Sequence, residues 1–587
     1  MRKNATPLAM RSIHMDQRIA PTVELWSKNV TDKDLLDELQ QLRADDSDEL
    51  YDAFYKDLAF GTAGLRGTLG VGTNRMNVHV VARATQGVAN YLNAHYDNPT
   101  VALGRDSRNK GEDFQRVAAG VLAANGIRVY VYPRIEPVPA ISFAVRRLQT
   151  SAGIVLTASH NPAKYNGYKL YNNHGGQIAN EAADEISASI AKTDMFDGIL
   201  CMDFDEALTQ GLIEWTPEYV LDDFIKAVMK VSIPGFKAAP GYKVVYTPLN
   251  GTGIECVKRI LAEIGVTDVT VVPEQAYPDG NFPTCPYPNP EFREALELGL
   301  KLAEKVKPQL LVATDPDADR MGAAVPHKGE YKLITGNEMG VLLMDWLARM
   351  AAQSGKDVRS KVAVTSIVSS SMCDALAADA GFELRRVLTG FKYVGEQIDQ
   401  LTDAGEEQRF LMGFEESYGY LVGTHARDKD AIVATMLCIE MASSYAEKGM
   451  DLYEAIEALY DRYGYYLNGV VNAAFPGAAG ADRMQQIMEE LRQNAPDSFA
   501  GYKVLQVHDF AQGLMMPRVG GLQKEAPQYL PQANVLEFVL EGNNKLIFRP
   551  SGTEPKIKAY LFSCGETREA SEAALAALRQ AAEDVLK

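Results

Sequence analysis

The sequence lacks the features that place a protein in a membrane or outside the cell. No segment of the 587 residues approaches the roughly 18 uninterrupted apolar residues that a membrane-spanning helix needs. The first 20 residues contain basic side chains but no apolar stretch of the kind that a secretory signal carries. The six cysteines are scattered, without a Cys-x-x-Cys pair, so neither a disulfide framework nor a zinc site is indicated. We therefore expect a cytoplasmic protein.

A basic excess is also missing. The formal net charge is −18, whereas proteins that bind nucleic acids or anionic membranes need a broad basic surface. We therefore predict neither kind of partner, and an anionic small substrate would need a local cluster of basic groups. The apolar content of 46% and the charged content of 23% are typical of globular proteins, and the length predicts about four domains.

Three successive stretches alternate strand-like and helix-like segments, which is typical of three-layer α/β domains. Their predicted strands are 101–103, 128–132 and 153–156, then 244–246, 269–272 and 310–313, then 362–364, 384–388 and 409–412. A helix-like stretch from about 32 to 58 precedes them, and from about 465 the pattern becomes that of an α+β domain with an antiparallel sheet. We predict an N-terminal extension and four domains, with the boundaries 1–40, 41–210, 211–335, 336–460 and 461–587.

The first chemically dense loop follows the strand at 153–156 and reads Thr157-Ala158-Ser159-His160-Asn161-Pro162. Ligand sites of open α/β sheets lie at the carboxyl ends of the strands, and Pro162 prevents this strand from continuing. Ser159 is therefore expected on a constrained loop, where it can act as a nucleophile or carry a phosphoryl group. Taken alone, the same residues also fit a turn that caps a helix.

A run of acids follows the last predicted strand of the second domain. Asp315, Asp317 and Asp319 are spaced by two, so an extended segment would direct their oxygens at one cation. Such ligands favour Mg²⁺. A calcium EF-hand is disfavoured because its glycine and glutamate positions hold Arg320 and Pro326, whereas an aspartyl-phosphate enzyme and a solvated acidic turn stay open as alternatives.

Two glycine-containing loops are candidates for contacts with phosphate. Residues 60–67 read F-G-T-A-G-L-R-G and carry one cation, Arg66. Thr389-Gly390-Phe391-Lys392 joins a strand to a helix, where free amide groups and a lysine can hold an anion. Each signal is weak when taken alone.

Further polar loops follow in the third and fourth domains. Glu415, Glu416 and Ser417 suit recognition of vicinal sugar hydroxyls, because a carboxylate accepts two hydrogen bonds. The stretch 425–430, H-A-R-D-K-D, adds charged groups, although loop residues of this kind are commonly only solvated.

Residues 549–556, R-P-S-G-T-E-P-K, combine an arginine, two hydroxyls and a glycine between turn-forming prolines, which suits phosphate binding; a hairpin without function is the alternative. Because the loops of the three α/β domains follow equivalent strands, we expect one shared cleft.

Taken together and in this order, the loops resemble those of the α-D-phosphohexomutase family over nearly the whole chain. T-A-S-H-N-P resembles the family's phosphoserine loop, D-P-D-A-D-R its metal loop, G-F-E-E-S-Y-G its sugar-recognition loop and R-P-S-G-T-E-P its phosphate-binding loop. T-G-F-K and H-A-R-D-K-D resemble the phosphoglucomutase branch, and the long N-terminal extension resembles a subgroup of bacterial phosphoglucomutases and phosphopentomutase-like members. Pro316 and Ala318 stand where some relatives carry glycine, which leaves the three acids intact.

The resemblance implies three consecutive three-layer α/β/α domains with mixed sheets and a C-terminal α+β domain, similar to the TATA-box-binding protein, around one central cleft. It implies that phosphorylated Ser159 exchanges its phosphoryl group with glucose 1-phosphate or glucose 6-phosphate, with glucose 1,6-bisphosphate as intermediate and activator. One Mg²⁺ per chain would be held by Asp315, Asp317, Asp319 and an oxygen on Ser159.

The resemblance also suggests roles for the remaining residues. Arg66 and Arg320 would steady the phosphoryl group. Lys169 and Lys429 are the candidates for proton transfer or its electrostatic equivalent, and His160 is their rival. The predicted substrate-binding residues are Thr389, Gly390, Lys392, Glu415, Ser417, Arg427, Arg549, Ser551, Gly552 and Thr553.

Other functions share these loops. A phosphomannomutase or a phosphopentomutase is the alternative within the family, and a metal-dependent sugar phosphatase is the alternative from another enzyme class. A phosphosugar sensor without catalysis would require the loss of Ser159 or of an acid in the metal loop, and none is missing. The expected partners are small sugar phosphates, and the expected assembly is a monomer or a weak homodimer.

Overall fold

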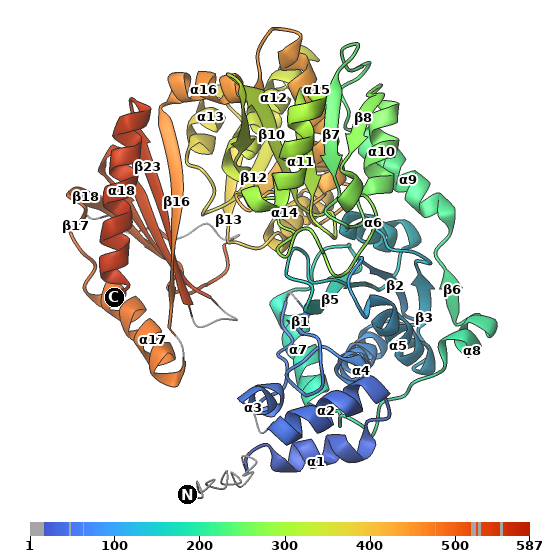
Figure 1. The fold of residues 1–587 in the computed structure, drawn as a ribbon. Helices are drawn as coiled ribbons and strands as arrows, with labels where there is room; N and C mark the ends of the chain where they lie inside the picture. Colours follow the sequence, from blue (N-terminus) through green and yellow to red (C-terminus); the bar gives the residue numbers. More distant parts are fainter. Residues whose placement is uncertain are drawn as a thin grey trace, which may run out of the picture.

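The computed structural model describes residues 17–45, 48–62, 64–475, 477–517, 524–525, 530–551 and 556–587. It contains four sheets that follow one another along the chain (Figure 1). The first three mix parallel and antiparallel strands and are covered by helices, and the fourth is a curled antiparallel sheet. The predicted fold class is therefore confirmed. No helix among the described residues combines the length and the apolar character needed to cross a membrane.

The first domain has the strand order β1-β5-β4-β2-β3-β6. Its strands are β1 (Leu65–Thr68), β2 (Thr100–Arg105), β3 (Arg128–Val131), β4 (Ala152–Leu156), β5 (Tyr165–Asn172) and β6 (Ile213–Trp215). Its helices are α4 (Val78–His95), α5 (Gly111–Ala124), α6 (Val138–Leu148), α7 (Asn180–Lys192) and α8 (Phe204–Thr209). Because β6 pairs with β3, this domain continues beyond the predicted boundary at 210.

Three further helices precede the first sheet, namely α1 (Ala20–Asn29), α2 (Lys33–Asp45) and α3 (Asp48–Phe54). The single helix-like stretch expected at 32–58 is thus two helices. Trp26, Leu39 and Phe54 are buried in the same apolar core as Ile154 of β4. The predicted extension 1–40 is therefore not a separate unit over its described part, because burial of these side chains joins α1 and α2 to the first domain.

The second domain has the strand order β11-β10-β9-β7-β8. Its strands are β7 (Lys243–Thr247), β8 (Asp268–Val271), β9 (Leu310–Thr314), β10 (Met321–His327) and β11 (Glu330–Ile334). Its helical elements are α9 (Glu218–Met229), α10 (Ile254–Glu263), the 3₁₀ turn η1 (Pro273–Gln275) and α11 (Arg293–Val306).

The third domain has the strand order β13-β12-β14-β15. Its strands are β12 (Val362–Ser366), β13 (Glu383–Val387), β14 (Phe410–Glu415) and β15 (Gly419–Leu421). Its helical elements are α12 (Gly336–Gln353), η2 (Val358–Ser360), α13 (Met372–Ala380), α14 (Lys392–Asp403), η3 (Glu407–Arg409), α15 (Ala431–Ala446) and α16 (Leu452–Tyr463). Helix α15 is mostly apolar and buried on nearly all sides, and it packs against α10 and β9 as well as β15, so the second and third domains share one core.

The fourth domain has the strand order β16-β23-β22-β21-β18-β19-β20, and β17 pairs with β18. Its strands are β16 (Tyr465–Ala474), β17 (Ser498–Phe499), β18 (Tyr502–Asp509), β19 (Leu514–Pro517), β20 (Lys524–Glu525), β21 (Leu536–Leu540), β22 (Lys545–Pro550) and β23 (Lys556–Gly565). Its helical elements are α17 (Gly477–Gln493), η4 (Glu541–Asn543) and α18 (Arg568–Val585), which packs on β16 and β23.

One arrangement recurs in the three α/β domains. A strand that is parallel to its neighbour ends in a polar loop, and an antiparallel strand then returns beside it: β4 is followed by β5, β9 by β10 and β14 by β15. The sequence patterns predict the first strand of each pair but not the returning one. The three loops therefore lie at the tips of equivalent hairpins, at the carboxyl ends of the parallel strands, where ligand sites are expected.

Candidate active site

One cavity of about 600 Å³ is lined by residues of all four domains. The first domain contributes His160, the second Arg320, the third Glu415 and Ser417, and the fourth Arg549. These residues come from loops that the sequence analysis selects. The packing of the four domains therefore brings the loops to a shared cleft.

Ser159 lies directly after β4 and is buried. Its Oγ is 3.0 Å from Nδ1 of His160 and donates a hydrogen bond of 3.1 Å to Oδ2 of Asp315. Its backbone has a φ of +53°, which a residue with a side chain seldom adopts. Its amide donates to the hydroxyl of Thr157 at 2.8 Å, which helps to hold this conformation. The loop thus directs a single hydroxyl at the acidic loop of the second domain.

Asp315, Asp317 and Asp319 lie in a turn between β9 and β10, rather than in the extended segment expected from their spacing. The turn closes by a hydrogen bond of 2.9 Å from the Ala318 amide to the Asp315 carbonyl, and Ala318 has a φ of +52°. One carboxylate oxygen from each acid lies within 4.8 Å of those of the other two. The acids therefore converge because the backbone turns back on itself, and not because alternate residues of a strand share a face.

The acidic turn fits a hard divalent cation. All three carboxylates are buried, and Oδ1 of Asp317 and Oδ1 of Asp319 accept no hydrogen bond from any described residue. Burial raises the pKa of Asp315 well above its ordinary value, and the charges of Asp317 and Asp319 raise it further. Three convergent carboxylates with unused oxygen lone pairs are the ligand type that Mg²⁺ and Ca²⁺ bind.

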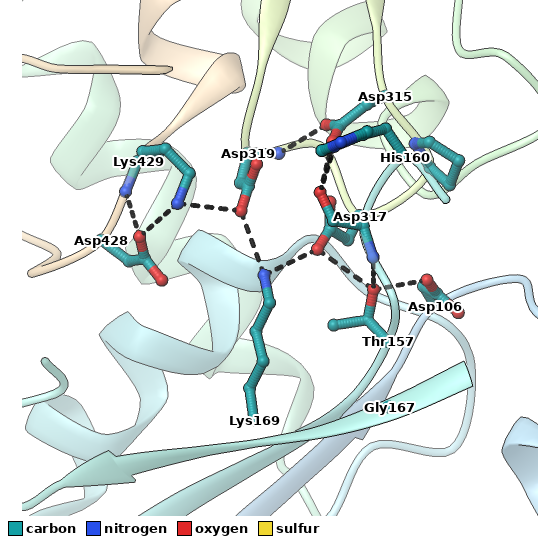
Figure 2. A network of polar contacts seen from close by, with 12 residues as sticks. Asp106, Thr157, His160, Gly167, Lys169, Asp315, Asp317, Asp319, Asp428 and Lys429 are labelled. Carbon is teal, nitrogen blue, oxygen red and sulfur yellow. Dashed lines mark hydrogen bonds and ion pairs between the residues drawn. The ribbon is translucent and has the colours of Figure 1, made fainter. Parts of the chain in front are cut away.

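Two lysines bring positive charge to the other side of the acidic turn (Figure 2). Lys169 Nζ lies 2.9 Å from Oδ2 of Asp317 and 3.1 Å from Oδ2 of Asp319, and Lys429 Nζ lies 3.1 Å from the same oxygen of Asp319. Burial acts to lower the pKa of Lys169, but the neighbouring carboxylates outweigh it and raise the pKa. Burial acts to raise the pKa of Asp319, but the two lysines outweigh it and lower the pKa. Both lysines are therefore held as cations.

His160 and two arginines surround the Ser159 loop. Burial lowers the pKa of His160 well below its ordinary value, and the charges of Arg320 and Arg66 lower it further, so the imidazole is neutral at pH 7. Arg66 is exposed, and its Nη1 donates to Oδ1 of Asn161 at 3.4 Å. The backbone amide of Arg320 donates to Oδ1 of Asp315 at 2.9 Å, and its side chain lines the cavity.

The predicted sugar-recognition residues meet in the third domain. The amide of Gly390 donates to Oε1 of Glu415 at 2.7 Å, which joins the loop before α14 to the end of β14. Ser417 and Thr389 line the cavity, and the buried Oγ1 of Thr389 has no hydrogen-bond partner among the described residues. Glu416 accepts hydrogen bonds from two serine hydroxyls. Its burial, and to a lesser extent the charge of Glu415, raise the pKa of Glu416 to about 7.

Two predicted substrate-binding residues lie elsewhere. Arg427 is fully buried, and its guanidinium binds Asp399 Oδ1 at 2.6 Å together with the carbonyls of Thr424 and Ala426. It therefore fixes the loop that carries Lys429 instead of facing the cavity. Lys392 Nζ donates to Oδ1 of Asn180 at 2.9 Å, so it joins the first and third domains. Neither side chain lines the cavity.

The described residues of the predicted phosphate-binding loop, 549–551 and 556, belong to β22, to β23 and to the position that follows β22. Arg549 lines the cavity, and the amide of Ser551 donates to the carbonyl of Lys556 at 2.8 Å. Gly552 and Thr553 lie outside the described residues. The structure shows a second basic side chain beside Arg549. Lys558 of β23 also lines the cavity, and it pairs with Arg549 between the two strands. Lys558 could have been identified from the sequence. It lies two positions after Lys556, the last residue of the predicted loop, and residues two positions apart on a strand point to the same side.

Comparison with known proteins agrees with this geometry. Three consecutive segments match the α/β/α domains I, II and III of the phosphoglucomutase/phosphomannomutase family, over residues 57–196, 222–329 and 335–463. A phosphoglucomutase from Staphylococcus saprophyticus is 35% identical over 537 residues, which cover 91% of this chain and 95% of the relative. This chain belongs to the phosphoglucomutase/phosphomannomutase family.

Solved structures of the family have the same fold. A crystal structure of a putative phosphomannomutase from Thermus thermophilus aligns with a TM-score of 0.66 at 22% identity, over 90% of this chain and 99% of that one. The open form of parafusin from Paramecium, a phosphoglucomutase, aligns with a TM-score of 0.66 at 20% identity, over 91% of this chain and 95% of that one. The fold of these structures therefore extends over about 90% of this chain.

Within this family member, a group of buried polar residues that the sequence patterns did not single out lies behind Ser159. Asp106 follows β2, and its Oδ2 lies 2.6 Å from the Thr157 hydroxyl, which is also 3.1 Å from Oδ2 of Asp317 (Figure 2). Arg108 contacts the carbonyls of the Ser159 loop. Their position could have indicated a role for Asp106 and Arg108. The stretch G-R-D-S-R follows β2, which neighbours β4 in the sheet.

A second group of potential metal ligands lies away from the cavity. His327, Asp451 and Glu454 place ligand atoms within 4.8 Å of one another. Asp451 and Glu454 already form the capping box of α16, and His327 Nδ1 lies 3.0 Å from Oδ2 of Asp451. These contacts explain why the three side chains lie together, since they form the cap of α16 and its hydrogen-bond partner.

Proposed function

We propose that this chain is a phosphoglucomutase that interconverts α-D-glucose 1-phosphate and glucose 6-phosphate through a phosphoserine at Ser159 and bound glucose 1,6-bisphosphate. The observation that carries the proposal is the placement of the Ser159 hydroxyl 3.1 Å from Asp315, beside a cavity to which the sugar-recognition and phosphate-binding loops also contribute. The identity of 35% with a phosphoglucomutase over most of both chains supports the choice of glucose phosphates.

The proposed reaction consists of two phosphoryl transfers. In the first, the free hydroxyl of the sugar phosphate attacks the phosphorus on Ser159, the bond between Oγ and phosphorus breaks, the proton of the sugar hydroxyl passes to Oγ, and a bisphosphate forms. In the second, the Ser159 hydroxyl attacks the other phosphate of the reoriented bisphosphate, the bond between that phosphorus and the sugar oxygen breaks, and the released sugar oxygen gains the proton that Ser159 loses, so that Ser159 is phosphorylated again. No phosphate is lost, so the sugar phosphate is isomerised without net hydrolysis.

The proposed metal is one Mg²⁺ held by Asp315, Asp317 and Asp319, with an oxygen on Ser159 as a further ligand. When bound, this ion supplies positive charge that neutralises the oxygens of the transferred group. The unused carboxylate oxygens in the acidic turn support the assignment. Lys169 and Lys429, which their carboxylate neighbours keep cationic, supply fixed positive charge on the opposite side of Asp319.

Proton movement is assigned to His160. Its Nδ1 lies 3.0 Å from the Ser159 Oγ, which is the atom that loses a proton when it attacks and regains one when the phosphoryl group leaves. A general base must be neutral before it accepts a proton, and the lowered pKa of His160 meets this requirement. Lys169 and Lys429 are less suited to this role because their raised pKa values keep them protonated.

Substrate recognition is assigned to two walls of the cavity, one from the third domain and one from the fourth. Glu415, Ser417 and Thr389 would bind sugar hydroxyls, while Arg549 and Lys558, with the predicted Ser551, Gly552 and Thr553, would hold the phosphate that is not being transferred. Because both walls recognise groups that exist at either end of the sugar, the bisphosphate can bind in two orientations. Arg66 and Arg320 would steady the transferred phosphoryl group.

The proposal is tested by assaying the purified chain with glucose 1-phosphate, Mg²⁺ and glucose 1,6-bisphosphate, coupled to oxidation of the glucose 6-phosphate formed. We expect turnover without release of inorganic phosphate. Phosphate release at the rate of sugar phosphate consumption would identify a phosphatase instead. Parallel assays with mannose 1-phosphate and ribose 1-phosphate test the sugar preference, and a higher kcat/KM for either would transfer the assignment to a phosphomannomutase or a phosphopentomutase.

A further inference from the structure

Arg108 holds the Ser159 loop by its backbone. This residue follows β2 and is 3% exposed. Its Nη2 donates to the carbonyl of Ser159 at 2.6 Å and to the carbonyl of Asn161. Its Nη1 donates to the carbonyls of Pro162 at 3.0 Å and of Tyr165 at 2.9 Å. The four terminal N–H groups of one guanidinium are therefore matched to three carbonyls of the loop and one at the start of β5.

The remaining nitrogen of the guanidinium, Nε, donates no hydrogen bond among the described residues but forms an ion pair with an acid that also supports the loop. Nε of Arg108 lies 3.3 Å from Oδ2 of Asp106, and the Arg108 amide donates to Oδ1 of Asp106 at 2.9 Å. The same Oδ2 lies 2.6 Å from the Thr157 hydroxyl, whose oxygen accepts the hydrogen bond of the Ser159 amide. Asp106 thus fixes both Arg108 and the group that holds the Ser159 amide.

The Ser159 backbone needs such support. Its φ of +53° lies in the left-handed region, where a residue with a side chain is strained. In addition, four carbonyl oxygens converge on one point, where they repel one another unless a cation lies between them. The Arg108 guanidinium satisfies all four and makes the strained conformation the stable one. The direction of the Ser159 hydroxyl toward Asp315 follows from that conformation.

Only arginine has the donors for this arrangement. Its planar guanidinium presents five N–H groups in a rigid fork, whereas a lysine presents three donors from one nitrogen atom. A lysine at this position would keep the charge but could not reach four separated carbonyls. The site therefore selects the shape of the cation and not merely its sign.

We propose that Arg108 is a positioning residue that holds Ser159 in its left-handed conformation for phosphoryl transfer. Arg108 does not touch the reacting atoms. Its loss should misplace the Ser159 hydroxyl and so lower kcat, while sugar binding at the far walls of the cavity, and with it KM, stays close to that of the wild type. The kinetic test of this inference rests on the proposed mutase function. The hydrogen-exchange test does not depend on that function.

The experiment compares Arg108→Ala and Arg108→Lys with the matched control Arg75→Ala. Arg75 is also a buried arginine of the first domain, and its guanidinium binds the carbonyls of Asp52 and Asn74 and the Asp52 carboxylate, away from the Ser159 loop. The measurements are melting temperature, kcat and KM for glucose 1-phosphate, rescue by guanidinium ion at a non-denaturing concentration, and hydrogen exchange of the peptide that spans residues 157–166.

For Arg108→Ala we expect kcat to fall about 100-fold, because displacement of a reacting group by about 1 Å has effects of that size, with KM within about threefold of the wild type. Guanidinium ion should raise the kcat of Arg108→Ala about tenfold. Exchange in residues 157–166 should rise. Arg108→Lys should lose kcat without a large change in melting temperature. Arg75→Ala should show neither the kinetic loss, the rescue nor the increased exchange in this peptide.

Wild-type kcat in Arg108→Lys, or a loss in Arg108→Ala that guanidinium ion does not restore, would overturn the inference. Failure of both Arg108 variants to fold would overturn it as well, since Arg108 would then serve the stability of the domain rather than the placement of Ser159. If the wild-type chain has no mutase activity, the proposed function fails, and unchanged exchange of residues 157–166 in Arg108→Ala then decides separately against the inference.

Discussion

The hydroxyl of Ser159 lies 3.1 Å from the carboxylate of Asp315, although 156 residues separate them in the sequence. Contacts between the first two domains hold this distance. The amide of Val138, at the start of α6, donates to the carbonyl of Asp317 at 2.9 Å, and Nδ2 of Asn109 donates to Oδ1 of Asn281 at 2.8 Å. The Ser159 hydroxyl and the acidic turn are thus positioned by domain packing.

Ser159→Ala should abolish the mutase reaction while leaving the fold intact. The substitution removes the atom that carries the phosphoryl group, so we expect activity to fall about 1,000-fold or more. The melting temperature should change little, because the hydroxyl is lost but the backbone contacts of the loop remain. Coupled assay and thermal unfolding measure the two effects. Ser151→Ala, at the opposite end of β4, is the control and should stay active. An unaltered rate in Ser159→Ala would remove this residue from the mechanism.

Asp317→Asn should weaken the response to metal before it weakens the fold. In the wild type, we expect Mg²⁺ to relieve the repulsion among three buried carboxylates and, because it binds the folded state, to raise the melting temperature. We expect this rise to shrink or disappear in Asp317→Asn, together with most of the activity. Thermal unfolding with Mg²⁺ and with EDTA measures the effect. Asp279→Asn, on a loop of the second domain, is the control and should keep the wild-type response. A chain that remains fully active after chelation would contradict the metal assignment.

The stability of the protein should depend on the protonation of Glu440. This carboxylate of α15 accepts hydrogen bonds from the Ser232 hydroxyl and, at 3.0 Å, from the Ile233 amide, so it fixes the linker that precedes β7. Burial raises the pKa of Glu440 to about 7, although these hydrogen bonds oppose the rise. The folded state therefore binds the proton more tightly than the unfolded state, whose pKa is about 4.3.

This difference sets the sign of the pH dependence. Between about pH 4.3 and pH 7 the folded state holds more protons, so the contribution of Glu440 to stability falls as the pH rises, by up to about 4 kcal/mol. Glu440→Gln cannot ionise and should flatten this part of the stability profile. Thermal unfolding from pH 5 to pH 8 compares the wild type, Glu440→Gln and the exposed control Glu447→Gln. Parallel profiles for the wild type and Glu440→Gln would show that Glu440 does not titrate in this range.

The fourth domain should close over bound bisphosphate. Phe292 of the second domain and Val470 of the fourth both line the cavity, yet they are 48% and 40% exposed, so the cavity is open in this structure. Phosphoryl transfer requires exclusion of water, because water would otherwise hydrolyse the phosphoserine. We expect the radius of gyration from X-ray scattering to decrease when glucose 1,6-bisphosphate is added. Arg549→Ala should respond less, since it lacks a phosphate contact on the closing face. Identical scattering profiles with and without the bisphosphate would contradict closure.

The loops and the fold class were predictable because their signals are local. The T-A-S-H-N-P stretch follows an apolar strand, and D-P-D-A-D-R contains its three acids within five residues, so neither depends on distant contacts. Alternation of strands and helices likewise indicated three α/β domains, which the structure confirms. In contrast, the acids converge in a turn and not along an extended segment, because the left-handed Ala318 reverses the backbone. Spacing alone does not reveal that conformation.

The amino-acid sequence by itself determined which chemical groups this protein possesses and on which loops they lie, since hydrophobic periodicity and turn residues act over short stretches of chain. Tertiary structure alone decided which of these groups meet. It brought Lys169 and Lys429 to the same oxygen of Asp319, and it buried Arg427 against Asp399, away from the cavity. The physical reason is that such contacts depend on how the domains bury their shared surfaces, which is a property of the whole chain and not of any one segment.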